Sequence, residues 1–158
     1  MNERSHKRAI CLAIAVTTVF TGWIFNHLLI TTSPSLNHRV FWKLDGDIAK
    51  GDYVNFILYN SLINGGHASI TKRVACWPGD MLLRVDRSFY CNGLFLGTAK
   101  SKSFEGKPLP LFQFQGRIPQ GMAFVAGDDR NSFDSRYWGF LDLHEPIQRL
   151  TPVRLLGI

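Results

Sequence analysis

Charge is what the first part of this 158-residue chain lacks, because no Asp, Glu, Lys or Arg occurs between Arg8 and Arg39. Cysteine is also scarce: the chain has three, with no C-x-x-C pair, and its five histidines show no spacing typical of metal ligands. We therefore expect no metal site and no other cofactor. A composition that is 46% hydrophobic and only 19% charged excludes a disordered chain, and the length leaves room for one compact domain.

The net charge of +6 does not indicate a nucleic-acid partner. Glu3, Arg4, Lys7 and Arg8 contribute +2 at the N-terminus, and the remaining +4 is scattered from residue 39 to residue 154 without a stripe or a cluster. Proteins that bind nucleic acids gather their basic residues on one face or along one helix. The sequence therefore excludes a nucleic-acid binder, and the uncharged stretch suggests lipid as the partner instead.

The uncharged stretch contains an apolar run, Ala9–Ile30, that predicts a transmembrane helix. Its 22 residues would span about 33 Å at 1.5 Å per residue, enough to cross a bilayer core of about 30 Å. A cleaved secretory signal is the alternative, but its apolar region would have about 7 to 15 residues and would end at a small-x-small site. Ala13 and Ala15 have that spacing but lie in the middle of the run, so we expect an uncleaved anchor.

Basic residues precede the apolar run and none follow it closely, so the positive-inside rule places the N-terminus in the cytoplasm. We expect a single-pass protein of a bacterial inner membrane, with residues 1–30 as cytoplasmic tail and anchor and residues 31–158 as a periplasmic domain. That compartment is oxidising. Cys76 and Cys91 both lie in the exported part, whereas Cys11 lies in the run. We predict a Cys76–Cys91 disulfide, which would stabilise the folded domain by roughly 3 kcal/mol because it closes a loop in the unfolded chain.

The part after residue 30 has no sustained 3.6-residue apolar period, so its fold class is mainly β. Short apolar stretches bounded by turn residues such as Gly65-Gly66 and Asn92-Gly93 predict strands. These stretches are Asp52–Tyr59, Ala68–Cys76, Met81–Val85, Phe89–Leu96 and Met122–Ala126. Residues 99–121 are polar and rich in Pro and Gly, and predict a long surface loop or a loose hairpin.

Two stretches carry residues able to act as a nucleophile and a base. Ser33-Pro34-Ser35 follows the apolar run, but a serine needs a base beside it, and without one this segment is an ordinary polar linker. Strand alternation in Ala68–Cys76 places Lys72 on the same face as Ile70 and Val74. Burial on that face would lower the lysine pKa from about 10.4 and give a base near neutral pH, while an amine extended into solvent at the sheet rim is the open alternative.

A third stretch, residues 127–140, is dense in small, charged and aromatic residues and comes directly after the strand predicted at Met122–Ala126. Loops of this kind often line functional sites. A calcium-binding acidic turn is the alternative, but the stretch lacks the glycine and glutamate spacing of an EF-hand.

The order of these three stretches resembles the type I signal peptidase family, membrane-anchored serine peptidases with a Ser/Lys dyad. In that family an anchor is followed by S-x-S, then by K-R-V-x-G-x-P-G-D, then by G-D-N-R and S-x-D-S-R-Y-x-G. The matching residues here are Ser33-Pro34-Ser35, Lys72-Arg73-Val74 with Pro78-Gly79-Asp80, and Gly127-Asp128-Asp129-Arg130 with Ser132-Phe133-Asp134-Ser135-Arg136-Tyr137-Trp138-Gly139. The resemblance covers nearly the whole chain and implies a compact, antiparallel β-sheet catalytic domain.

The resemblance also implies a role for each matched residue. Ser35 would be the nucleophile, and Lys72 the base that takes its proton and returns it to the leaving amine. The backbone N–H of Ser35 and the hydroxyl of Ser33 would hold the oxyanion. Ser132 would hydrogen-bond to the lysine and orient it.

Asp134 and Arg136 resemble a supporting ion pair of the family. Three positions depart from the family pattern: Asp129 stands where the box usually has Asn, and Asn37 and Arg39 replace a Pro and a Gly. Asp129 would change the local turn of the box, and Asn37 and Arg39 would change the geometry on the substrate side of the site.

Lys43, Cys76 and residues 89–97 resemble the TraF-type branch, conjugative-transfer peptidases that mature pilin subunits. In some of its members the pilin's own N-terminal amine resolves the acyl-enzyme and gives a circular subunit. We therefore expect an endopeptidase that cleaves a membrane-associated precursor such as a conjugative pilin, and both water and the pilin's own amine stay open as the group that resolves the acyl-enzyme. The partners would be that precursor, membrane lipid and other conjugative-transfer or secretion components.

Two alternatives stay open. A general type I signal peptidase would process many exported preproteins. A non-catalytic bitopic subunit of an envelope assembly would explain the anchor and the disulfide, but not why a serine, a lysine and the Ser132 box stand in the peptidase order.

Overall fold

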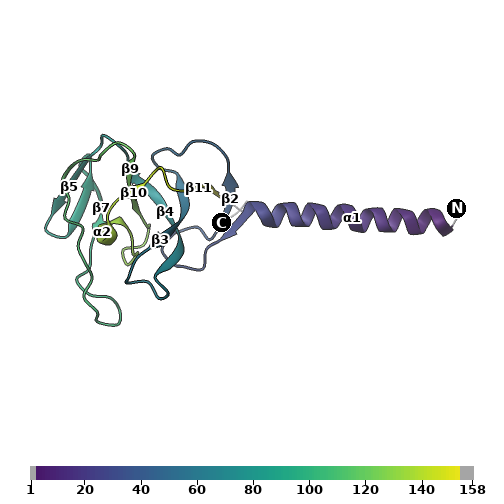
Figure 1. Cartoon of the computed structure of the whole chain (residues 1–158), viewed down its shortest axis with the longest axis horizontal. Helices are drawn as coiled ribbons and strands as arrows, with labels where there is room; N and C mark the ends of the chain where they lie inside the picture. The colour runs from purple at the N-terminus through teal and green to yellow at the C-terminus, as the bar shows by residue number, and fades with distance from the viewer. Residues whose placement is uncertain (1–2, 154–158) are drawn as a thin grey trace.

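The computed structural model describes residues 3–153 and consists of one long helix joined to a β-rich body (Figure 1). Its elements in chain order are α1 (Glu3–His27), β1 (Leu28–Ile30), β2 (Val40–Leu44), β3 (Tyr53–Tyr59), β4 (His67–Cys76), β5 (Met81–Val85), β6 (Ser88–Cys91), β7 (Leu94–Thr98), β8 (Gly116–Arg117), β9 (Met122–Ala126), α2 (Ser135–Trp138), β10 (Leu141–Asp142) and β11 (Gln148–Pro152).

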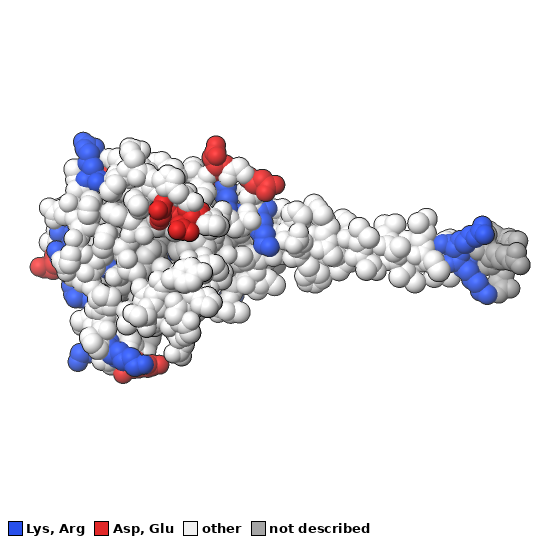
Figure 2. Space-filling view, in the orientation of Figure 1, with Lys and Arg blue, Asp and Glu red and all other residues white. Residues whose placement is uncertain are grey.

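Helix α1 projects from the body as a stalk with its apolar side chains exposed. Its segment His6–His27 has a mean hydropathy of 1.8 and is the one described helix long and apolar enough to cross a membrane. Between a basic N-terminal end and the body, the visible face of the stalk carries no charged side chain (Figure 2). The hydroxyls of Thr17 and Thr18 donate to the carbonyls of Ala13 and Ile14, so neither polar group is left unpaired in an apolar surrounding.

The helix predicted over Ala9–Ile30 is wrong in its last three residues. Leu28–Ile30 leaves the helix and forms β1, which pairs antiparallel with β2. Trp42 of β2 packs against the rings of Trp23 and His27, with centroid distances of 5.5 and 5.6 Å. Backbone pairing and these ring contacts outweigh the helical pattern, so the β-rich body begins directly at the end of α1.

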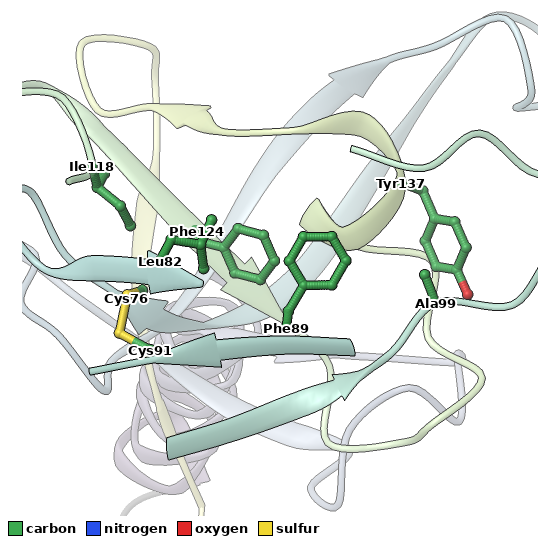
Figure 3. Close-up of a cluster of buried hydrophobic side chains, with 8 residues drawn as sticks. All are labelled: Cys76, Leu82, Phe89, Cys91, Ala99, Ile118, Phe124 and Tyr137. Atoms are coloured by element: carbon green, nitrogen blue, oxygen red, sulfur yellow. A yellow bond between two sulfur atoms is a disulfide. The ribbon is translucent and has the colours of Figure 1, made fainter. Parts of the chain in front are cut away.

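Two antiparallel sheets form the body. The larger has the strand order β1-β2-β11-β3-β4-β9-β10 and the smaller has the order β7-β6-β5-β8. A cluster of buried side chains packs between the sheets, with Phe89 of β6 and Phe124 of β9 5.4 Å apart (Figure 3). The mainly antiparallel β class predicted from the sequence is confirmed.

The strands predicted at Met81–Val85 and Met122–Ala126 have the predicted bounds. The stretch predicted over Phe89–Leu96 is the β6–β7 hairpin and not one strand, and the turn residues Asn92 and Gly93 indicated by the sequence lie at positive φ in its turn. Residues 99–121 form an extended loop with one isolated bridge and the two-residue strand β8. Strands β2 and β11 were not predicted; they pair with each other, and β11 also pairs with β3.

Cys76 and Cys91 form a disulfide that joins the end of β4 to β6, and so fastens the larger sheet to the smaller one (Figure 3). Their Cα atoms lie 5.8 Å apart and both side chains are buried. The bond therefore fixes the end of the strand that carries Lys72.

We expect the double variant Cys76→Ser, Cys91→Ser to lose about 3 kcal/mol of unfolding free energy, because the bond closes a loop over a sequence separation of 15 residues. Chemical denaturation of the full chain in detergent micelles measures this loss. Cys11→Ser, which changes the free cysteine on exposed α1, is the control and should leave the midpoint unchanged. Alkylation without reductant should modify one of the three cysteines, and modification of all three would contradict the disulfide.

Candidate active site

Ser35 lies in the segment between β1 and β2, where the chain turns into the body. Its side chain is buried, and so is that of Leu36, which packs in a small cluster with Phe41 and Leu150. The carbonyl oxygen of Ser35 accepts a hydrogen bond of 3.2 Å from the backbone N–H of Asp129. The apolar neighbour and this bond hold the serine in place, so Ser33-Pro34-Ser35 is not a free linker.

Lys72 reaches Ser35 from β4, whose neighbour β3 places Val54 opposite it. The side chain is only 4% exposed, and its Nζ lies 3.0 Å from Ser35 Oγ in a hydrogen bond. Lys72 is thus buried as the strand alternation predicts, and its amine does not extend to solvent. The fold thus brings together two residues that are 37 positions apart in the chain.

Burial lowers the pKa of the Lys72 amine from 10.5 to about 8. The low-dielectric surroundings disfavour the ammonium form, and the positive charge of Arg136 adds to this effect. The carboxylates of Asp134 and Asp128 act in the opposite direction without cancelling it. At pH 7 roughly a tenth of an amine with this pKa is neutral and can accept a proton, a fraction about 300 times that of a lysine with the ordinary pKa.

Ser33 lies beside the same hydroxyl. Its Oγ is 3.1 Å from Ser35 Oγ and accepts the backbone N–H of Ser35 at 3.3 Å. The two donors that the resemblance assigns to an oxyanion therefore converge on one side of Ser35.

Ser132 is buried, and its Oγ has no hydrogen-bond partner among the residues that the structure describes. The hydrogen bond expected between Ser132 and Lys72 is thus not formed here. Ser132 does line the same cavity as Ser35 and Lys72. Its Oγ is buried against the backbone of Gly127.

Gly127 allows the loop that carries Ser132 to approach the serine. A Cβ at position 127 would overlap the Ser132 side chain and would come within 2.7 Å of the Ser35 carbonyl oxygen. The sequence-based prediction gave Gly127 no role, although it opens the third motif. The signal was a glycine directly after a buried strand, where backbone often approaches another group closely.

Asp134 and Arg136 form a fully buried ion pair below this loop. Arg136 donates from Nε and Nη2 to the two Asp134 carboxylate oxygens, each at 2.7 Å. Asp134 also accepts the backbone N–H of Gly127, and Arg136 donates to the carbonyl of Ser132. The pair thus fixes both ends of the loop that lies over Ser35.

Asp128 ties the serine segment to the larger sheet. Its Oδ2 accepts the backbone N–H of Asn37 at 3.1 Å and the hydroxyl of Tyr53 at 3.3 Å, and its Oδ1 lies 3.5 Å from Nε of Arg73. A proline at position 37, as in the family pattern, would have no N–H to donate. Asn37 therefore adds a contact between the serine segment and the loop.

Asp129, the other departure in the box, bonds to Ser35 through its backbone, so this contact does not depend on whether Asp or Asn stands there. Its side chain accepts the backbone N–H of Asn131. Arg39 is exposed.

Two cavities flank the Ser35–Lys72 contact. One of about 260 Å³ is lined on its outer side by Leu29 to Thr32, and one of about 510 Å³ extends to residues 129–133. The two cavities share Ser33, Ser35, Ile70 and Lys72. A polypeptide crossing the serine has space on both sides of it.

A mainly antiparallel β-body with this site matches a known family of peptidases. The family described as "Signal peptidase, peptidase S26" matches residues 4–151, and the chain belongs to this family. Signal peptidases are serine endopeptidases that process precursor proteins, so membership places the chain in this class of enzyme.

The chain is similar to a signal peptidase I of Bacillus caldolyticus, with 26% identity over 155 residues that cover 90% of this chain and 84% of the relative. It is also similar to a probable signal peptidase I-2 of Synechocystis sp., with 31% identity over 100 residues, 58% of this chain and 43% of the relative. A crystal structure of a signal peptidase I from Enterococcus faecalis superposes with a TM-score of 0.41 at 23% identity, over 70% of this chain and 98% of that chain.

We expect Arg136→Ala to lose about 3 to 5 kcal/mol of unfolding free energy, because it leaves the Asp134 carboxylate buried without its partner. Denaturant titration of the full chain in micelles measures the loss. Lys107→Ala removes the exposed Lys107–Glu105 pair and should leave the midpoint unchanged. A loss in Arg136→Ala no larger than in this control would contradict a stabilising role for the pair.

Proposed function

We propose that this protein is a membrane-anchored serine endopeptidase in which Ser35 and Lys72 form the catalytic dyad. The observation that carries the proposal is the 3.0 Å contact between Lys72 Nζ and Ser35 Oγ in a buried site. A lysine with a pKa of about 8 is able to act as the general base, and the serine hydroxyl is within reach of its amine.

The reaction begins when Ser35 Oγ attacks the carbonyl carbon of the scissile peptide bond, while the neutral Lys72 amine takes the hydroxyl proton. A C–O bond forms, and the carbonyl oxygen becomes an oxyanion. Collapse of this intermediate breaks the C–N bond, and Lys72 gives its proton to the leaving amine. Water then hydrolyses the acyl-enzyme, or a peptide amine attacks it and forms a new amide bond.

The backbone N–H of Ser35 and the hydroxyl of Ser33 would donate to the oxyanion. In the free protein both donors bond within the segment, the Ser33 hydroxyl to Ser35 Oγ and the Ser35 N–H to Ser33 Oγ, so a substrate oxygen would replace these two bonds by two of its own. One such donor is typically worth roughly 3 to 4 kcal/mol of transition-state stabilisation. Ser132, Asp134 and Arg136 would act as positioning residues around the lysine and the loop.

The substrate we propose is a membrane-associated precursor. With α1 as a single-pass anchor, a cytoplasmic N-terminus and residues 31–158 in the periplasm of a bacterial inner membrane, β1 would bring the site close to the lipid surface. Lys43, Cys76 and residues 89–97 resemble the TraF-type branch, and this resemblance favours a conjugative pilin over a general preprotein as the substrate. In some members of this branch pilin maturation includes cyclisation, so hydrolysis and cyclisation are the two outcomes that the product mass distinguishes.

We expect mass spectrometry of a pilin precursor, coexpressed in membranes with the wild type, to show loss of a terminal peptide. Ser35→Ala and Lys72→Met should each leave the precursor intact, because they remove the nucleophile and the base. A product lighter by one further water would identify cyclisation. Ser61→Ala and Lys107→Met, at exposed positions, are the matched controls that should retain processing.

Full processing by Lys72→Met would contradict the dyad. Cleavage of general preproteins but not of pilin would retain the dyad and replace the proposed substrate. No Ser35-dependent cleavage of either substrate would favour the non-catalytic assembly subunit.

We expect kcat/KM to rise with pH and to reach half of its plateau near pH 8, because the ammonium form of Lys72 that dominates at lower pH cannot accept the serine proton. A pH profile of precursor cleavage by the full chain in micelles measures this. Lys72→Arg, which keeps a positive charge at all these pH values, should show no activity along the profile. A rise centred at the ordinary pKa of histidine would point to a different base.

A further inference from the structure

The larger of the two cavities beside the dyad has apolar walls that the reaction itself does not use. It has a volume of about 510 Å³, and its walls include Ile63 from the β3–β4 connection, Phe133 from the loop after β9, and Phe104 from the loop after β7. Phe104 is 89% exposed. Leaving such a ring in water forgoes burial of a large apolar surface, and an occupant of the cavity would cover it.

Phe104 is held at the rim by an ordered turn. Residues 101–109 form a short hairpin in which Lys102 and Pro108 are bridged and the backbone N–H of Ser103 donates to Lys107 at 2.8 Å. Gly106 closes the turn at a φ of 78°, and its N–H donates to Ser103. The exposed ring is therefore presented by a fixed backbone.

Ser132 belongs to the wall of this cavity, but its Oγ is buried and lies against the backbone of Gly127, without a hydrogen-bond partner among the described residues. The surface that the cavity offers an occupant is therefore mainly the apolar one, as is typical of a binding pocket.

The position of the cavity relative to α1 gives the direction in which a substrate crosses the site. The smaller cavity is lined by Leu29 to Thr32, which follow α1 directly, whereas the larger one lies toward the hairpin of residues 101–109. This hairpin belongs to the green part of the body, away from the stalk (Figure 1). A precursor held by a membrane segment before its scissile bond would enter along β1 and leave through the larger cavity.

We propose that the cavity walled by Ile63, Phe104 and Phe133 binds an apolar side chain among the first residues after the scissile bond. This inference rests on the proposed peptidase function. Beyond Phe104 a second cavity of about 240 Å³ continues the path, and it is bordered by Leu62, Leu109, Lys100 and Lys102. The first cavity therefore favours an apolar residue just after the scissile bond. The two lysines beside the second cavity favour an acidic residue further along the polypeptide.

The test uses the full chain in micelles and a precursor with its membrane segment before the scissile bond. Its first three residues after that bond are changed one at a time between leucine and serine. We expect leucine at one of these positions to raise kcat/KM about tenfold, as for burial of one apolar side chain. Phe104→Ala should abolish the leucine preference and leave cleavage of the serine substrate unchanged. Leu94→Ala, at a site that is 71% exposed on the β6–β7 hairpin, is the matched control and should keep the preference.

A second measurement locates the occupant without catalysis. Precursors carrying benzoylphenylalanine are bound to Ser35→Ala and irradiated. A probe just after the scissile bond should cross-link to residues 60–63, 104 or 131–133, and a probe just before it should cross-link to residues 29–32.

The outcomes separate the two proposals. Equal cleavage of the leucine and serine substrates, a preference that persists in Phe104→Ala, or the reversed cross-linking pattern would overturn the subsite. Cleavage of these precursors that persists in Ser35→Ala, or the absence of Ser35-dependent cleavage of these precursors, of pilin and of general preproteins alike, would overturn the peptidase function.

Discussion

The contact between Lys72 and Ser35 is the constraint on which the rest of this structure depends. Removing a lysine amine from water is unfavourable, and the fold accepts this cost by burying it under the chain segment that carries the serine. The result is an amine whose pKa lies at about 8, beside a hydroxyl that also contacts the Ser33 hydroxyl. Burial of this kind serves chemistry, since an exposed lysine would hold its proton at neutral pH.

The loop of residues 127–136 keeps the two groups together. Gly127 permits its close approach, Asp128 accepts the N–H of Asn37, and the buried Asp134–Arg136 pair fixes the loop from below. Each of these contacts includes a backbone group, so the loop and the serine segment pack against each other as one side of the site. The disulfide between Cys76 and Cys91 fixes the other end of β4. The site is thus assembled from three distant parts of the chain, each held by its own local interactions.

The join between α1 and β1 couples the site to the membrane segment. Leu28–Ile30 changes from the predicted helix to a strand because β2 offers backbone partners and Trp42 packs on the last turn of the helix. With no linker between them, helix and sheet hold the serine segment at a fixed distance from the apolar stalk. The two cavities beside Ser35 therefore differ in position: one lies next to the stalk, and the other lies next to the exposed ring of Phe104.

The sequence by itself determined the apolar helix, the mainly β class, the order of the three motifs and the buried face of Lys72, because each is written in local composition or periodicity. It also indicated the Cys76–Cys91 pair. The tertiary structure alone decided the end of α1, which segment approaches Gly127 and the unpaired hydroxyl of Ser132. Those features depend on contacts between segments far apart in the chain, and local composition does not show which segments meet.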